Sequence, residues 1–184
     1  MNPSQTRPLA VVMRTQERTD LPGGLGADYA ASDDEHRPLG GYAVLMGTFA
    51  TLFVGALVAA NRTGHELPER IGVQDVILGG IATHKVSRLI TKDKVTSTIR
   101  APFTRYQRKA GHGELDETPR GTGLRYAAGE LLVCPYCIAH WVAAGFVVGH
   151  VFAPRQTRLL SAMWTVHAVA DAAQLAYGAA ERRS

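Results

Sequence analysis

Apolar residues gather in four long stretches of the chain, which polar or basic segments separate. Residues 41–59 carry no charged side chain, and about 20 apolar residues are enough to cross the core of a bilayer. Residues 71–90 are a weaker apolar stretch with helical spacing, and two more follow towards the C-terminus. The pattern predicts an all-α, multi-pass transmembrane helical bundle of three or four spans, at about 41–60, 71–90, 129–152 and 158–180.

The first apolar stretch has two other interpretations. Val58-Ala59-Ala60 resembles a signal-peptide cleavage site, but the tail before the stretch is long for a signal peptide. A soluble helical domain would instead require residues 41–59 to be a buried core helix. Gly47, Thr51 and Gly55 recur every four residues, a stripe of small side chains that suits close packing between membrane helices.

The segments around the apolar stretches complete the domain organisation. Residues 1–38 are rich in proline, glycine and acidic residues, and they predict a disordered N-terminal tail. The helical membrane domain then covers 39–184. Within it, residues 91–128 form a basic cytoplasmic loop, and residues 111–123 predict a turn or a short hairpin.

The basic loop also has an amphipathic pattern. Apolar residues at helical spacing predict a helix that lies on the membrane surface and bends at Pro102. These apolar positions are Val95, Ile99, Phe103 and Tyr106. The cations expected to face anionic lipid head groups are Lys92, Lys94, Arg100, Arg105, Arg108 and Lys109.

The charge distribution sets the expected orientation. The chain has 20 lysines and arginines and a net charge of +4. If both ends and the basic loop are cytoplasmic, the outer side holds only Arg62, Arg70, Arg155 and Arg158. This bias follows the positive-inside rule. Charge alone would also suit nucleic acid, but no recognition motif supports that partner, so we expect membrane lipids and no nucleic acid.

The candidate chemistry lies in Cys134-Pro135-Tyr136-Cys137. If a helix begins at Pro135, Cys134 caps it, and the helix dipole would lower the pKa of the thiol. If the helix begins near Gly129, both cysteines share a face with Glu130 and Trp141. The pair has three interpretations: a thiol–disulfide site, a metal site completed by His140 and a ligand such as His84 or Asp171, or two small packing residues.

Helix length gives these polar residues a shared depth. At about 1.5 Å per residue, polar groups on three predicted spans fall in the cytoplasmic half of the membrane. We therefore expect a cluster of His84, Arg88, Cys134, Cys137, His140 and Asp171. The simpler version is a single pair, either Arg88–Asp171 or His84–Asp171, that fixes helix packing.

Four sequence motifs, taken in order, resemble a known family. They are Ala82-Thr83-His84-Lys85-Val86-Ser87-Arg88-Leu89-Ile90-Thr91-Lys92-Asp93-Lys94-Val95, Ile99-Arg100-Ala101-Pro102-Phe103, Gly121-Thr122-Gly123-Leu124-Arg125, and Gly129-Glu130-Leu131-Leu132-Val133-Cys134-Pro135-Tyr136-Cys137-Ile138-Ala139-His140-Trp141. Together they resemble a bacterial membrane-protein family called domain of unknown function 1360. The resemblance implies motif roles for Arg88, Asp93, Arg100, Pro102, Phe103, Cys134, Cys137 and Trp141. It does not make His140 a signature position, and it carries no activity.

The sequence thus predicts a protein of the bacterial inner (cell) membrane with cytoplasmic termini. We expect a structural or interaction component, with a membrane-protein partner or a second copy, and we assign no enzymatic activity. The alternative is a thiol-redox or metal-binding membrane protein that uses Cys134 and Cys137. No cofactor is expected under the first interpretation, and a metal only under the second.

Overall fold

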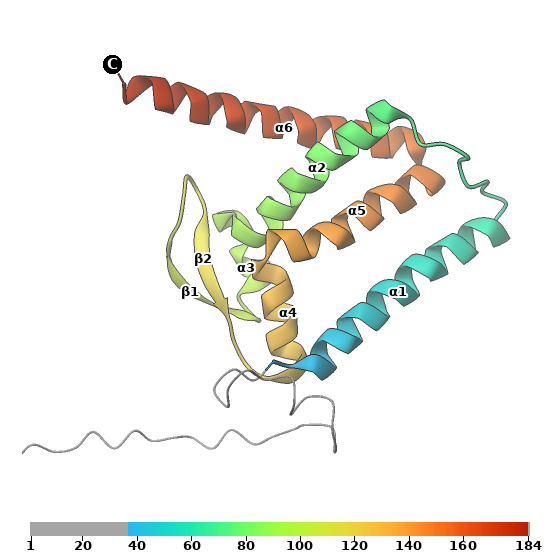
Figure 1. The fold of residues 1–184 in the computed structure, drawn as a ribbon, viewed down its shortest axis with the longest axis horizontal. Helices are drawn as coiled ribbons and strands as arrows, with labels where there is room; N and C mark the ends of the chain where they lie inside the picture. The colour runs from blue at the N-terminus through green and yellow to red at the C-terminus, as the bar shows by residue number, and fades with distance from the viewer. Residues whose placement is uncertain (1–36, 184) are drawn as a thin grey trace, which may run out of the picture.

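The computed structural model describes residues 37–183, and most of these residues are helical (Figure 1). The α-helices are α1 (Leu39–Arg62), α2 (Val73–Lys92), α3 (Ser97–Arg100), α4 (Gly123–Val133), α5 (Pro135–Phe152) and α6 (Pro154–Glu181). A short 3-10 helix, η1 (Lys94–Thr96), precedes α3, and two strands, β1 (Thr104–Lys109) and β2 (Leu115–Pro119), form an antiparallel pair. The predicted N-terminal tail falls almost entirely on residues 1–36, outside the described residues.

The long helices lie close to their predicted positions. The stretches at 41–60 and 71–90 form α1 and α2, and the last stretch forms α6. Within residues 37–183, α1 and α5 are each long and apolar enough to cross a membrane by length and composition. The sequence predicted three or four spans, but among the described residues only these two helices meet the criterion of length and composition.

The helix predicted over 129–152 is two helices. The chain bends at Cys134, between the end of α4 at Val133 and the start of α5 at Pro135. Proline lacks a backbone N–H and suits the first position of a helix. Cys134 caps α5, because its Sγ accepts a hydrogen bond from the backbone N–H of Cys137 at 3.2 Å. A helix beginning near Gly129, with one face shared by Glu130 and both cysteines, is therefore wrong.

The basic segment is a hairpin rather than a helix on the membrane surface. Helical structure ends at Arg100, and β1 then pairs with β2, with an irregularity in register between Tyr106 and Arg108. The turn between the strands contains Gly113, whose φ of +77° is a conformation that glycine adopts readily. The predicted surface helix bent at Pro102 is thus wrong. The turn or short hairpin predicted at 111–123 contains the second strand of the observed hairpin, and the first strand lies before it.

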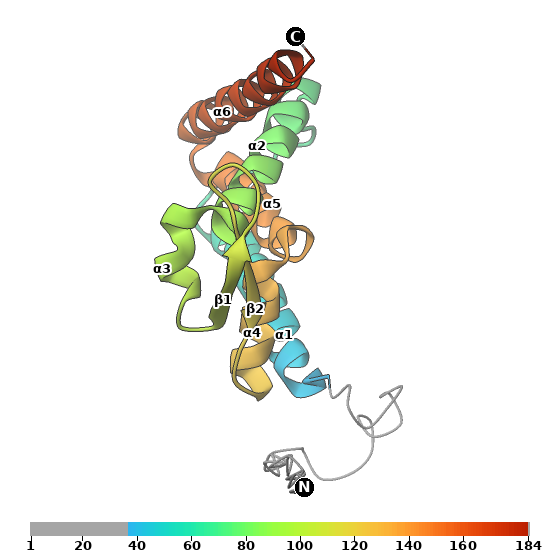
Figure 2. The same ribbon diagram turned by 90° about the vertical axis from the view of Figure 1, so that its left-hand side faces the viewer.

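The helices pack around α2, which lies between α5 and α6 (Figure 1). The loop α1–α2 and the turn α5–α6 lie at one end of the helices, where the rings of His65 and Phe152 are 5.0 Å apart. The hairpin and α4 lie at the other end, with α4 between the hairpin and α1 (Figure 2). The hairpin and the bend at Cys134 are therefore at the same end of the molecule.

Burial is inverted relative to a soluble domain. Among the described residues, the buried apolar side chains are Ala60, Ala82, Ala127 and Ile138. The buried polar residues are Lys85, Ser87, Thr91, Arg100, Thr104, Thr157, Ser161 and Thr165. Large apolar side chains are exposed on α1, α2 and α6, including Met46 at 72% and Val73 at 75%. Small and hydroxyl residues thus fill the interior, and large apolar residues cover the outside.

Candidate functional site

A fully buried arginine holds the hairpin to the end of α2. Arg100 is 0% exposed, and all five of its N–H donors have acceptors. Its Nε and Nη2 donate to the two carboxylate oxygens of Glu117 at 2.9 and 3.0 Å. Its other bonds go to the carbonyls of Ile90 (2.8 Å) and Asp93 (3.0 Å) and to Oγ1 of Thr96 (2.7 Å). Arg100 therefore cannot face lipid, and that part of the prediction is wrong.

The partner carboxylate is held in its ionised form. Burial raises the pKa of Glu117, but hydrogen bonds from Arg100 and Thr104 outweigh this effect, and the net pKa lies below the ordinary 4.5. Thr104 Oγ1 donates to Glu117 at 2.7 Å. Sequence reasoning missed Glu117, since it lies in an acidic run that we assigned to a turn. The signal was the mixture of cations and carboxylates within one short segment.

Two further carboxylates dock the hairpin on α2. Arg88 donates to both oxygens of Glu114 at 2.5 and 2.7 Å, and Nε adds a bond of 3.1 Å. Asp116 pairs with Arg108 at 3.0 Å and with Lys92 at 3.6 Å. The hydrogen bond from Arg108 lowers the pKa of Asp116 below its ordinary value, although burial opposes the shift.

These pairs change the predicted lipid-facing set. Arg100 is buried, and Lys92 and Arg108 are bound to Asp116. Within residues 37–183, Lys94, Arg105 and Lys109 have no carboxylate partner. Three of the six predicted cations are thus free for an external anion.

Two other motif positions, Asp93 and Phe103, act through the backbone. The Asp93 carbonyl accepts from Arg100, and the neighbouring N–H of Lys94 donates to the Gly113 carbonyl at 2.9 Å. The carbonyl of Phe103 accepts from the N–H of Arg120 at 2.9 Å. It also lies so close to Gly129 that a Cβ there would be 2.6 Å from it. The third motif joins them through Arg125, which donates to the carbonyl of Pro102. The four motifs therefore each contribute to one junction, which joins α2, the hairpin and α4.

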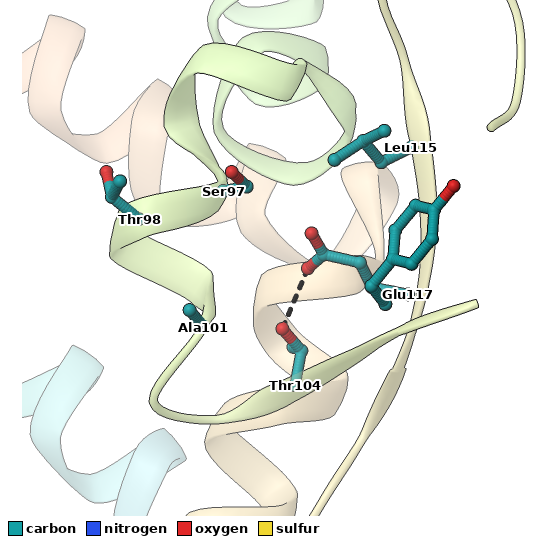
Figure 3. A pocket seen from close by; sticks show the side chains of 7 residues that line it. Ser97, Thr98, Ala101, Thr104, Leu115 and Glu117 are labelled. Carbon is teal, nitrogen blue, oxygen red and sulfur yellow. Dashed lines mark hydrogen bonds between the residues drawn. The ribbon is translucent and has the colours of Figure 1, made fainter. Parts of the chain in front are cut away.

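A pocket opens beside this junction, between α3 and the hairpin (Figure 3). Its volume is about 340 Å³. It is lined by Ser97, Thr98, Ala101, Thr104, Tyr106, Leu115 and Glu117. The Thr104 hydroxyl and the Glu117 carboxylate point towards each other there. Both carboxylate oxygens already accept bonds from Arg100, so the pocket offers no free charged group from its lining.

The cysteines lie outside the junction, at the bend between α4 and α5. Cys134 and Cys137 are joined as a disulfide, with Cα atoms 5.3 Å apart. Cys137 is exposed and Cys134 is partly buried. His140 is exposed, and the Trp141 ring packs edge-to-face on Phe49 of α1 at 5.3 Å.

The predicted polar cluster does not form. Asp171 of α6 accepts a hydrogen bond from Lys85 at 2.5 Å, rather than from His84 or Arg88. One residue along a helix turns a side chain by about 100°, so Lys85 faces α6 and His84 is exposed. Across residues 37–183, no three His, Cys, Asp or Glu side chains gather in a way that could hold a metal ion.

A second ion pair joins the same two helices near their N-terminal ends. Arg158 of α6 donates to both oxygens of Asp75 on α2, at 2.9 to 3.2 Å. Between the two pairs, Thr165 Oγ1 donates to the carbonyl of Leu78 at 3.0 Å. Helices α2 and α6 are therefore linked by polar contacts along most of their shared length.

Comparisons with known proteins cover the same part of the chain. The model of a family of proteins of unknown function, DUF1360, matches residues 78–177. UPF0713 protein YngL of Bacillus subtilis is 29% identical over 90 residues, which are 47% of this chain and 65% of that protein. The match thus spans less than two thirds of the relative's length. No solved structure matches the chain.

Proposed function

This chain belongs to the DUF1360 family, and we propose that it is a multi-pass protein of the bacterial inner membrane that works by binding rather than by catalysis. The observation that carries the proposal is the inverted burial of the helices. Soluble monomers rarely expose apolar patches beyond a few hundred Å². Here large apolar side chains are exposed on α1, α2 and α6, while small and hydroxyl residues lie between the helices. This arrangement suits hydrocarbon as the surrounding solvent.

The helix ends support four crossings with alternating direction. The loop α1–α2 and the turn α5–α6 lie at one end, and the hairpin lies at the other (Figure 1). The cation-poor end carries Arg62, Arg70, Arg155 and Arg158. The cation-rich end would face the cytoplasm, with both termini. In α2 and α6, Lys85 pairs with Asp171 at the crossing depth and Asp75 pairs with Arg158 near the cation-poor end, which lowers the cost of placing these charges in or beside the membrane.

The hairpin would then lie at the cytoplasmic face of the membrane. Lys94 of η1 and Arg105 and Lys109 of β1 have no carboxylate partner within residues 37–183 and are available to anionic head groups, each worth about 1 kcal/mol near a charged leaflet. The pairing of the other cations with Glu114, Asp116 and Glu117 supports a folded docking module instead of a loose polybasic loop. The partner would be the lipid surface together with a membrane protein or a second copy of this chain.

Membrane insertion and orientation can be tested together. In a Cys134→Ser/Cys137→Ser background, His65→Cys marks the loop α1–α2 and His112→Cys marks the hairpin turn. We expect a membrane-impermeant maleimide to label His65→Cys in intact cells, and His112→Cys only after permeabilisation. Carbonate should leave both variants in the membrane pellet. Release by carbonate without detergent would refute membrane insertion, and the opposite labelling order would refute the orientation.

A second candidate function is thiol redox chemistry at the bend. The supporting observation is the exposed Cys137 beside the start of α5, joined to Cys134. A helix start favours the thiolate form, which is the reactive form in exchange with a partner dithiol or disulfide. Titration in glutathione buffers, followed by alkylation, measures the potential of the pair. Fast alkylation of the reduced protein near neutral pH, absent from Cys134→Ser/Cys137→Ser, would support this function, and slow alkylation would refute it. Metal analysis of the reduced protein tests the metal alternative in the same preparation.

A further inference from the structure

Two arginines, Arg120 just before the third motif and Arg125 at its end, converge on one neutral acceptor. The carbonyl oxygen of Pro102 accepts from Nε of Arg120 at 3.2 Å, and from Nε and Nη2 of Arg125 at 3.0 and 2.6 Å. Two positive charges are thus drawn to a single uncharged oxygen. Like charges repel at this range unless an anion lies between them. The two guanidinium groups thus lie together without an anion from the residues that position them.

The described part of the chain does not balance these charges. Across residues 37–183 neither Arg120 nor Arg125 has a carboxylate partner, and three of their terminal nitrogens (both Nη of Arg120 and Nη1 of Arg125) have no acceptor. Carboxylates on the elements that flank this turn are engaged elsewhere: Glu117 of β2 with Arg100, and Glu130 of α4 with Arg37 and Tyr42. The free donors are therefore available to an external anion.

The turn before α4 is shaped to hold the second arginine. Gly121 has a φ of +87°, which side-chain-bearing residues rarely adopt. A Cβ at this position would lie 2.8 Å from Cδ of Arg125. The glycine therefore lets the aliphatic part of Arg125 lie against the turn, and the bond to Pro102 then fixes the guanidinium. Fixing the donors in advance lowers the entropic cost of binding a ligand.

The position of this turn indicates the source of the anion. A Cβ on Gly41, in the first turn of α1, would lie 3.0 Å from the carbonyl oxygen of Gly123 and 2.8 Å from Cβ of Ala127. The start of α1 and the start of α4 are thus in contact. Because α1 has the length and composition of a membrane span, its first turn marks the depth at which the chain would enter the bilayer. Arg120 and Arg125 then lie at the level of the lipid head groups.

We propose that Arg120 and Arg125 form a binding site for the phosphate group of an anionic phospholipid in the cytoplasmic leaflet. Guanidinium groups match phosphate oxygens in geometry and can donate two parallel hydrogen bonds. The site rests on the proposed membrane function and makes it more specific. One lipid head group is bound beside α1 and α4. The remaining cations of the hairpin form only a diffuse positive surface.

The test uses the full chain purified in neutral detergent. Native mass spectrometry would count bound phosphatidylglycerol against phosphatidylcholine for the wild type, Arg120→Gln/Arg125→Gln, and Arg105→Gln/Lys109→Gln. The last variant is a matched control, because it removes two cations that lack carboxylate partners from the same module. We expect the first variant to lose about tenfold or more in phosphatidylglycerol affinity, since each charge-assisted bond is worth roughly a factor of ten. The control should lose about threefold or less, because the larger contribution of each cation requires a continuous charged leaflet, which a neutral detergent micelle lacks, and isolated surface charges are screened.

Equal losses in the two variants would overturn the site and leave only a diffuse charge effect. If inorganic phosphate binds through Arg120 and Arg125 while the protein shows no preference for phosphatidylglycerol over phosphatidylcholine, that result would overturn the lipid as the source of the anion. If Arg120→Gln/Arg125→Gln is not monodisperse, Arg125→Gln and Lys109→Gln form a second matched pair. The labelling of His65→Cys and His112→Cys reports separately on membrane insertion, so loss of the lipid site and loss of the proposed function are distinguishable.

Discussion

The hairpin module and the helical bundle satisfy many of their buried polar groups in different ways. In the bundle, hydroxyls such as those of Ser87 and Thr91 donate to carbonyls four residues earlier on the same helix, while Lys85 and Thr165 bind across to α6 and α2. In the hairpin, Arg88 reaches Glu114 and Arg100 reaches Glu117, from other elements. A helix whose polar groups are hydrogen-bonded within the helix itself can be stable in hydrocarbon before it packs against another helix. The hairpin depends on α2, because its carboxylates are paired with arginines of other elements. The two regions should therefore respond differently to mutation.

The largest effect should come from Arg100→Ala. The substitution leaves the Glu117 carboxylate buried without its cation and removes a bond from two carbonyls of the α2 end. Breaking a buried pair on one side costs about 3–5 kcal/mol. Limited trypsin digestion and chemical denaturation in detergent should detect loss of the hairpin. Arg105→Ala, on the exposed side of β1, should change the free energy of unfolding by less than about 0.5 kcal/mol. Equal effects would refute the special role of the buried pair.

A smaller effect should come from Gly129→Ala. The new Cβ would lie 2.6 Å from the Phe103 carbonyl and 3.0 Å from Cβ of Pro119, so α4 must move away from the hairpin. Overpacking of this kind costs about 1–3 kcal/mol. Gly145→Ala on α5 is the control, because no atom lies within 4 Å of its added Cβ. Thermal unfolding should separate the two variants, and a neutral Gly129→Ala would contradict the close contact of α4 with the hairpin.

A weaker effect should follow from acid. The folded-state pKa of Glu117 is lowered, so its stabilising contribution is complete above the ordinary value of 4.5 and is lost as the pH falls through the lowered pKa. The effect should be smaller than that of Arg100→Ala, because a protonated carboxyl can still accept hydrogen bonds. Protease resistance of the hairpin should fall in this acidic range. In Glu117→Gln this part of the pH dependence should disappear; if it persists, another group is responsible.

The smallest effect should come from Gly47→Ala in the bundle. The predicted stripe of Gly47, Thr51 and Gly55 suited close helix packing, yet no atom lies within 4 Å of a Cβ built at either glycine. An alanine there should therefore leave the stability of a single chain unchanged within about 0.5 kcal/mol. Gly41→Ala, which would meet Gly123 and Ala127, is the destabilising counterpart. A change of oligomeric state in Gly47→Ala would show instead that the stripe packs against a second copy.

The same contrast explains which features were readable from the sequence. The helices α1 and α2 begin and end within two residues of their predicted bounds, because apolar runs and helical spacing are local signals. The first strand of the hairpin was missed, because Val95 and Ile99 do have helical spacing and that spacing was extended to Tyr106. The alternation of Thr104 and Tyr106 before the turn at Gly111 was the available signal.

The candidate site was readable only in part. The resemblance singled out Arg88, Arg100 and Pro102, but it could not say that two of them bind carboxylates and the third binds through its carbonyl. Which carboxylate each arginine binds depends on where α2 ends and on how the hairpin folds back onto it. No local sequence pattern encodes this. The same limit explains why Lys85, and not His84 or Arg88, meets Asp171.

The contacts of Arg100 also set an order of events during synthesis. Two of its acceptors are the carbonyls of Ile90 and Asp93, at the end of α2, and its carboxylate partner is Glu117, which leaves the ribosome 17 residues after Arg100 itself. The guanidinium can find all of its acceptors only after α2 has become helical and the second strand has emerged. Closure of the hairpin therefore requires that the end of α2 is already helical, so an open hairpin would mark a chain whose second helix has not formed.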